Sequence, residues 1–131
     1  MQNAKCKIRE RGVTRMNAIY DKSFLFAIRI VKLYRYITDN KKEYVLSKQL
    51  LRSGTSIGAN VAEAEKGQSS ADFFAKMSIA LKEANETRYW LRLLHATDYL
   101  TDQQFLSMEK DVKELIALLV SICKANPSNN R

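Results

Sequence analysis

The side chains best suited to chemistry in this sequence are two glutamates three residues apart, Glu83 and Glu86. Carboxylates on bundle helices bind paired iron or manganese ions when two Glu-x-x-His pairs accompany them. The chain has a single histidine, His95, so it lacks that set of ligands. The sequence therefore predicts no metal site and no cofactor. Basic partners are available to the two glutamates instead: Arg52, Lys82 and Arg88.

Covalent catalysis needs a nucleophile that lies beside a base. The candidate nucleophiles Cys6 and Cys123 have no histidine near them in sequence, and Ser53 and Ser56 also lack a nearby base. A free cysteine on an apolar helix face usually behaves as a small hydrophobic residue. We therefore expect no enzymatic activity and no small-molecule substrate.

Two adjacent aromatic residues, Tyr89 and Trp90, offer rings that could stack on nucleotide bases. Tyrosine and tryptophan are also enriched where subunits meet. For this pair the sequence favours a place in the core or in a subunit interface over base stacking.

Two glycines four residues apart, Gly54 and Gly58, interrupt a helical pattern in the stretch SGTSIGANVAEA, residues 53–64. A phosphate-binding loop of the Walker type needs a wider glycine spacing followed by lysine, so the stretch does not match one. Each glycine inside a helix costs about 1 kcal/mol relative to alanine. We therefore expect close packing of another backbone against both glycines, from a neighbouring helix or another subunit. A kinked helix is the alternative.

Apolar periodicity predicts four helices that would position these residues. We expect them to begin near residues 17–23, 43, 70 and 102, and to end near residues 38, 65, 97 and 124. The apolar residues of the third helix repeat with heptad-like spacing: Phe73, Met77, Ala80, Ala84, Thr87, Leu91 and Leu94. Because the chain contains one proline, Pro127, the sequence predicts an all-α fold, an up-down-up-down antiparallel four-helix bundle.

The chain divides into three expected parts: a flexible basic arm (residues 1–16), the four-helix bundle (residues 17–126) and a disordered tail (residues 127–131). If the second and third helices pack antiparallel, residues equally far from their shared loop lie level with each other. Arg52 then falls between Glu83 and Glu86. The sequence predicts a structural polar cluster on these two helices: Arg52, Asn60, Glu63, Glu83 and Glu86.

Positive charge dominates the composition, with a formal net charge of +8. Such charge either serves solubility or attracts a polyanion, which can be nucleic acid or an acidic protein surface. The cations of the arm and of the first helix are the candidate nucleic-acid-binding residues: Lys5, Lys7, Arg9, Arg11, Arg15, Lys22, Arg29, Lys32 and Arg35.

The cysteines and the hydropathy of the sequence indicate the cellular compartment. Cys6 and Cys123 lie near opposite ends without paired spacing, so a disulfide framework is not expected and a reducing cytoplasm is the natural location. No apolar run approaches the ~20 residues that span a bilayer, so we expect no membrane association.

Three pieces of the sequence occur in a distinctive order and spacing: RSGTSIGAN with Glu63, then SSADFFAKMSIAL, then KEANETRYWL. In these pieces the chain resembles the four-helix-bundle family named for proteins encoded in ribosomal-RNA intervening sequences, over about residues 20–124. That family also includes the accessory variability protein of diversity-generating retroelements. The resemblance implies a cytosolic bundle that assembles into a ring, often a pentamer, without enzyme activity. For the retroelement branch it also implies a basic surface that engages a reverse transcriptase and nucleic acid.

Two functions remain open from the sequence. The first is a non-enzymatic homo-oligomer that associates with RNA, DNA or a nucleic-acid enzyme through its basic surface. The second is a ring-forming protein-interaction scaffold with no nucleic-acid role, in which the charge serves solubility or an acidic partner.

Overall fold

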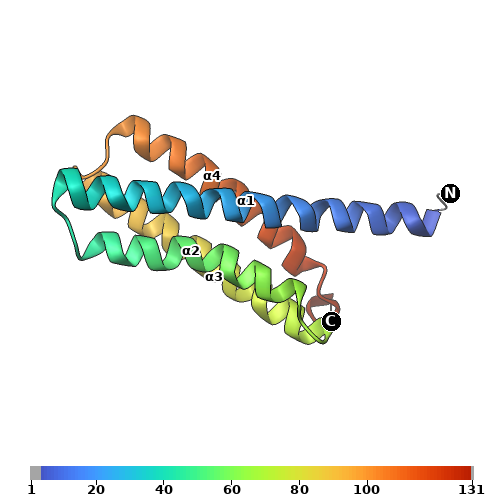
Figure 1. The fold of residues 1–131 in the computed structure, drawn as a ribbon. Helices are drawn as coiled ribbons and strands as arrows, with labels where there is room; N and C mark the ends of the chain where they lie inside the picture. The colour runs from blue at the N-terminus through green and yellow to red at the C-terminus, as the bar shows by residue number, and fades with distance from the viewer. Residues whose placement is uncertain (1–3, 131) are drawn as a thin grey trace.

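The computed structural model describes residues 4–130 of the chain, and the side chains of residues 16–128. Four long helices run alternately up and down, and a short 3-10 helix follows them (Figure 1). Their bounds are α1 (Ala4–Lys41), α2 (Leu46–Glu65), α3 (Ser70–Ala96), α4 (Asp102–Lys124) and η1 (Pro127–Asn130). This architecture confirms the predicted all-α four-helix bundle.

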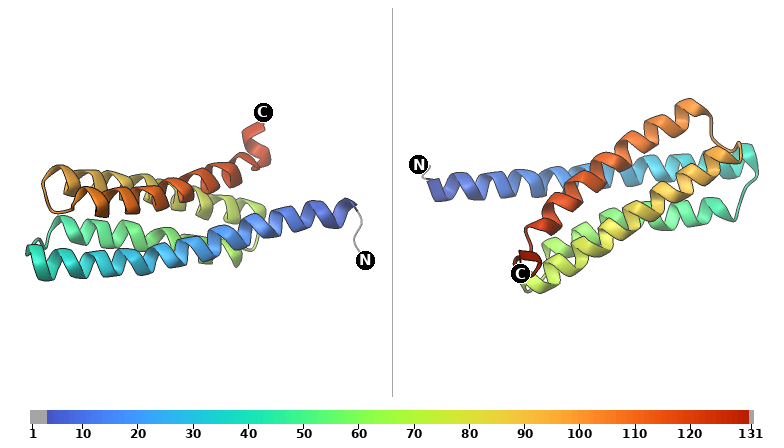
Figure 2. Two further views of the ribbon diagram at one scale, coloured as in Figure 1. Left: turned by 90° about the horizontal axis from the view of Figure 1, so that it is seen from above. Right: turned by 180° about the vertical axis from the view of Figure 1, so that it is seen from behind.

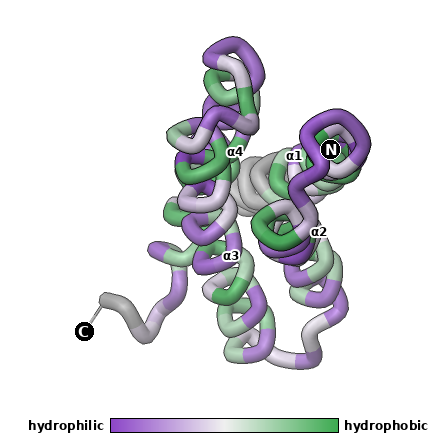
Figure 3. Tube along the Cα trace, turned by 90° about the vertical axis from the view of Figure 1, so that its left-hand side faces the viewer, coloured by the Kyte–Doolittle hydropathy of each residue, from purple (hydrophilic) through white to green (hydrophobic). Residues whose placement is uncertain are grey.

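The core lies between the four helices, each of which buries one apolar stripe. On α3 the predicted seam is buried from Met77 to Leu94, and Phe73 at its start is half-buried. On α1 the buried apolar residues are Ile19, Phe26, Ile30, Leu33 and Ile37. Hydrophobic and hydrophilic residues alternate along the helices, as expected where one face is buried and the other meets water (Figure 3).

The first helix is longer than the sequence pattern indicated. It begins at Ala4 instead of near residues 17–23, so the described part of the expected arm, residues 4–16, continues α1. This segment holds no proline, and lysine, arginine and alanine are good helix formers, so nothing in it forces the helix to end. At the other end, η1 occupies most of the tail that was expected to be disordered. Residues 1–3 and 131 lie outside the described part.

The N-terminal end of α1 projects past the other three helices (Figures 1 and 2). Helix α4 crosses α1 at an angle, so these two helices touch over a much shorter stretch than α2 and α3 do. Within residues 4–130, none of the helices combines the length and the apolar character needed to cross a membrane.

Helix α2 begins at Leu46, three residues later than predicted, because Glu43 caps it from outside. Glu43 Oε1 accepts hydrogen bonds from the N–H groups of Val45 (3.0 Å) and Leu46 (2.9 Å), and Oε2 accepts from that of Ser47 (2.7 Å). Burial by itself raises the pKa of Glu43, but these backbone hydrogen bonds outweigh burial and hold the pKa below its ordinary value. The buried carboxylate thus satisfies backbone groups that the first turn leaves without partners.

Gly54 and Gly58 let α2 pack tightly against α1. A Cβ atom added to Gly54 would lie 2.7–2.8 Å from three atoms of the Ile30 side chain. One added to Gly58 would lie 3.2 Å from the backbone oxygen of Ser23. The expectation of close packing is therefore confirmed, and within the described chain the neighbour is α1.

Candidate nucleic-acid interface

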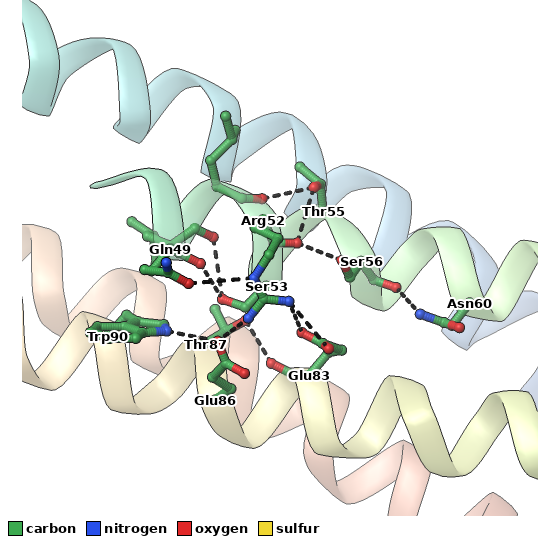
Figure 4. A network of polar contacts seen from close by, with 12 residues as sticks. Gln49, Arg52, Ser53, Thr55, Ser56, Asn60, Glu83, Glu86, Thr87 and Trp90 are labelled. Atoms are coloured by element: carbon green, nitrogen blue, oxygen red, sulfur yellow. Dashed lines mark hydrogen bonds and ion pairs between the residues drawn. The ribbon is translucent and has the colours of Figure 1, made fainter. Parts of the chain in front are cut away.

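An ion-pair cluster joins α2 and α3 at the level that the sequence predicted. Arg52 Nη1 lies 3.1 Å from Glu83 Oε2, and Arg52 Nη2 contacts Glu86 Oε2. The indole N–H of Trp90 donates to the same Glu86 oxygen at 2.9 Å (Figure 4). The sequence predicted that Arg52 meets Glu83 or Glu86, and the structure pairs it with both; the sequence reasoning missed Trp90 as the fourth member of the cluster.

The hydrogen bonds of this cluster stabilise its charged state. The hydrogen bond from Trp90 is the largest influence on the pKa of Glu86, and together with Arg52 it lowers that pKa against the opposing effect of burial. The hydrogen bond that Arg52 donates to Glu86 in turn raises the pKa of Arg52. A carboxylate held ionised and already bonded is a poor general base, so the geometry favours a structural role.

The other two members of the predicted cluster lie apart from this ion pair. Asn60 Nδ2 donates to the backbone oxygen of Ser56 in its own helix, at 2.8 Å. Glu63 pairs with Lys76 at 2.9 Å, and the hydrogen bond from Lys76 lowers the pKa of Glu63. The predicted group of five residues is thus corrected to a three-residue ion-pair cluster, an intrahelical hydrogen bond and a separate salt bridge. The cause is distance along α2, because Asn60 and Glu63 lie 8 and 11 residues after Arg52, which is about 12 and 16 Å further along the helix axis at about 1.5 Å per residue.

The hydroxyl groups of the glycine-containing stretch bond to their own helix. Ser53, Thr55 and Ser56 each donate to the backbone oxygen four residues earlier, at 2.9, 2.7 and 2.6 Å (Figure 4). Thr87 does the same on α3, at 2.7 Å. This local bonding lets small polar residues lie in a closely packed helix without unsatisfied groups. The stretch therefore serves packing.

The described part of the chain also bears on metal binding. There, no three or more His, Cys, Asp or Glu side chains come together in a way that could hold a metal ion. His95 Nε2 lies 2.7 Å from Asp102 Oδ1, at the junction of α3 and α4.

The four candidate cations on the bundle part of α1 do not form one surface. Lys22 pairs with Glu114 at 3.4 Å, and Arg29 pairs with Asp111, both across the seam to α4. Lys32 and Arg35 instead border a shallow apolar groove on the outside of α1. The candidate cations of the bundle thus divide between two sides of α1. Lys22 and Arg29, seven residues apart, face α4, whereas Lys32 and Arg35 lie on another face.

The five candidate cations of the expected arm lie outside the described side chains: Lys5, Lys7, Arg9, Arg11 and Arg15. Their backbone belongs to the projecting end of α1 (Figure 1). Over its whole length, α1 contains ten lysines and arginines against three acidic residues. Most of the net charge therefore lies along one helix.

Comparison with known families identifies the relationship. Residues 15–121 match the family of 23S rRNA-intervening sequence proteins. The chain belongs to this family. The resemblance that the three sequence pieces indicated is thereby confirmed.

One solved structure supports membership of the 23S rRNA-intervening sequence family in three dimensions. It is a protein of unknown function from the S23 ribosomal protein family of Bacteroides thetaiotaomicron VPI-5482, and it is 56% identical in sequence. The match covers 85% of this chain and 99% of that chain, with a TM-score of 0.84. The comparison with functionally curated proteins gave no match.

Proposed function

We propose that this chain is a non-enzymatic cytoplasmic module that self-associates and binds nucleic acid through its positive charge. The observation that carries the proposal is the composition of α1, which combines ten cations with an exposed apolar face. A helix of this kind can supply a subunit contact and a surface that attracts phosphates.

Self-association is supported by large apolar side chains that the bundle leaves uncovered. Phe24 and Leu25 are 66% and 60% exposed, and Tyr20 and Ile28 are each 38% exposed. All four lie on α1, and Tyr20, Phe24 and Ile28 recur every four residues, so they share one side of the helix. Exposed apolar side chains gathered in this way mark an interaction site. The family resemblance favours a ring of subunits, often five, as the assembly that covers this face.

Nucleic-acid binding is supported by cations without acidic partners. Lys32 and Arg35 form no ion pair with any side chain of residues 16–128. A ring would repeat them, and the basic end of α1, in every subunit. Because no base-reading motif is present, contacts fall on phosphates and depend little on sequence.

Two measurements test this proposal. Light scattering gives the mass of the assembly, and a homo-oligomer is expected at micromolar concentration. A titration with RNA and DNA at several salt concentrations gives the number of phosphate contacts, since each contributes about 0.7–0.9 to the log–log slope. Deleting residues 1–16 should flatten that slope.

A matched pair of charge changes shows where the phosphates bind. Lys32→Glu with Arg35→Glu should weaken binding strongly. Lys48→Glu with Lys110→Glu changes the net charge equally on exposed positions of α2 and α4, and should weaken binding much less. Equal effects of the two double variants would point to a diffuse attraction, and absence of binding at low salt would reject the proposal.

A protein-interaction scaffold without a nucleic-acid role is the second candidate. It is favoured by Lys22 and Arg29, whose charges are already compensated by Glu114 and Asp111 on α4. The remaining cations then serve solubility or bind an acidic protein, whereas a reverse transcriptase as partner belongs to the first proposal. This alternative is supported if the chain forms an oligomer that binds neither RNA nor DNA at low salt.

A further inference from the structure

A groove of about 530 Å³ lies between α3 and α4, away from the candidate cations of α1. This volume falls within the range common for small-molecule sites, about 300–1,000 Å³. Its walls include Tyr89, Arg92, Leu93, His95, Phe105 and Glu109. Three of these residues have aromatic rings, and Arg92 is a cation without an ion-pair partner in residues 16–128. The described candidate cations of α1 do not lie beside such a group of rings.

Tyr89 presents its ring to solvent beside Trp90. The side chain is 53% exposed, and its ring meets that of Trp90 edge-on, with centroids 5.0 Å apart. Trp90 is held by its hydrogen bond to Glu86, which Arg52 also contacts. The ion-pair cluster between α2 and α3 therefore supports the ring on which a ligand would stack.

A second pair of rings lines the groove near the start of α4. The rings of His95 and Phe105 are parallel, with centroids 4.3 Å apart and an angle of 2° between planes. His95 Nε2 lies 2.7 Å from Asp102 Oδ1, which fixes the plane of the imidazole. The groove thus has an ordered aromatic floor.

The charge of the groove favours an anion next to the aromatic surface. Arg92 is exposed, lies one helical turn after Tyr89, and forms no ion pair within residues 16–128. The negative charge of Glu109 is offset by Arg88 at 3.4 Å and Lys113 at 3.6 Å. The accessible charge beside Tyr89 is therefore positive.

We propose that this groove binds an unpaired base of single-stranded nucleic acid, with the base stacked on Tyr89 and the neighbouring phosphate on Arg92. The inference rests on the proposed nucleic-acid function and narrows its ligand to single strands. Bases in a duplex are stacked on one another, so they cannot lie flat on a protein ring unless they are splayed out. Further along the same exposed line of α3, Lys82 and Asn85 can contact the strand.

The experiment uses the full-length chain and three labelled probes of about 15 nucleotides: an unstructured single strand, the same strand with abasic sites, and a duplex. The abasic strand keeps the phosphates and lacks the bases. Wild-type protein should bind the intact strand about tenfold more tightly than the abasic one. Tyr89→Ala should remove most of this difference, whereas Tyr89→Phe should keep it.

Two further variants control for charge and for the loss of a surface tyrosine. Tyr44 is also 53% exposed but lies outside the groove, so Tyr44→Ala should leave the preference for bases unchanged. Arg92→Ala should weaken binding of the intact and the abasic strand alike, and should lower the salt slope by about one phosphate contact.

Several outcomes would overturn the inference. Equal affinity of the wild-type chain for intact and abasic strands, with a steep salt slope, rejects base stacking and leaves the charge-based function standing. A lower assembly mass for Tyr89→Ala in light scattering assigns Tyr89 to a subunit contact instead. Absence of binding to all three probes at low salt rejects both the inference and the proposed function.

Discussion

Replacing Gly54 by alanine tests the packing of α2 against α1 most directly. The added methyl group would meet Cγ1, Cγ2 and Cδ1 of Ile30 at 2.7–2.8 Å, well inside van der Waals contact. Ile30 is fully buried and branched at Cβ, so it cannot turn away without striking other core atoms. Either the Ile30 side chain or the whole of α1 must shift.

Two opposing effects set the size of the change. Overpacking a well-packed core costs about 1–3 kcal/mol. Alanine gains about 1 kcal/mol over glycine inside a helix. We therefore expect Gly54→Ala to lower the free energy of unfolding by about 1 kcal/mol, which corresponds to roughly 4 °C in Tm for a domain of this size.

The effect of Gly54→Ala on the free energy of unfolding should reverse sign when the side chain of Ile30 is truncated. Ile30→Ala alone should lower the free energy of unfolding by about 2–5 kcal/mol, because it leaves a cavity. In that background the methyl group at position 54 meets none of the three atoms, so Gly54→Ala should stabilise the protein by up to ~1 kcal/mol. The two substitutions should thus couple by about 2 kcal/mol.

Urea unfolding of the four proteins at one fixed protomer concentration measures this coupling, since assembly makes stability depend on concentration. Ala59→Gly, at an exposed position of the same helix, gives the intrinsic alanine–glycine difference in α2. If Gly54→Ala stabilises the wild-type protein as much as the Ala59 control implies, the packing argument is wrong. The same conclusion follows if its effect is equal in both backgrounds.

Three further predictions concern the polar contacts. A double-mutant cycle of Arg52→Ala and Glu86→Ala should give a coupling of at most about 1 kcal/mol in urea unfolding, because the two side chains are 48% and 37% exposed; a coupling of several kcal/mol would contradict this exposure. Glu43→Gln should lower the free energy of unfolding by about 1–2 kcal/mol at neutral pH, because it weakens the cap on α2. Because the folded-state pKa of Glu43 is lowered, its contribution is present above the ordinary value of 4.5 and is lost as pH falls through the folded-state pKa. Unfolding curves from pH 7 into acid should show the two proteins converging, and a constant difference would refute the capping role. Arg29→Ala and Asp111→Asn should each cost about 1 kcal/mol or less, and the double variant should cost less than their sum; strict additivity would show that the pair contributes nothing to the seam between α1 and α4.

The sequence determined which helices form and how α2 and α3 align. Periodicity alone located the buried seam of α3, because apolar residues at heptad-like spacing can be covered only on one face. A short loop between two antiparallel helices also fixes which residues lie level, since each residue advances a helix by about 1.5 Å. Arg52 therefore meets Glu83 and Glu86 as simple counting predicts.

Other local features were not readable from periodicity. The length of α1 was underestimated, because its first residues lack an apolar period and yet contain good helix formers. The role of Glu43 was missed, because a glutamate before a helix looks like a first-turn residue until its side chain is seen to bend back onto the backbone. In both cases the pattern of residue types was compatible with more than one conformation.

Tertiary structure alone decided which side chains meet between helices that no short loop joins. Helices α1 and α4 are separated by the two intervening helices, so their crossing angle depends on how side-chain volumes fill the core. That angle assigns Lys22 and Arg29 to acidic partners on α4 and leaves Lys32 and Arg35 exposed. The groove beside Tyr89 also depends on packing, although a short loop joins α3 and α4, because the rotation of each helix about its axis determines which rings share a surface. Spacing along the sequence fixes how far along its helix a residue lies. Only the packing of the helices fixes which side chain of another helix it meets.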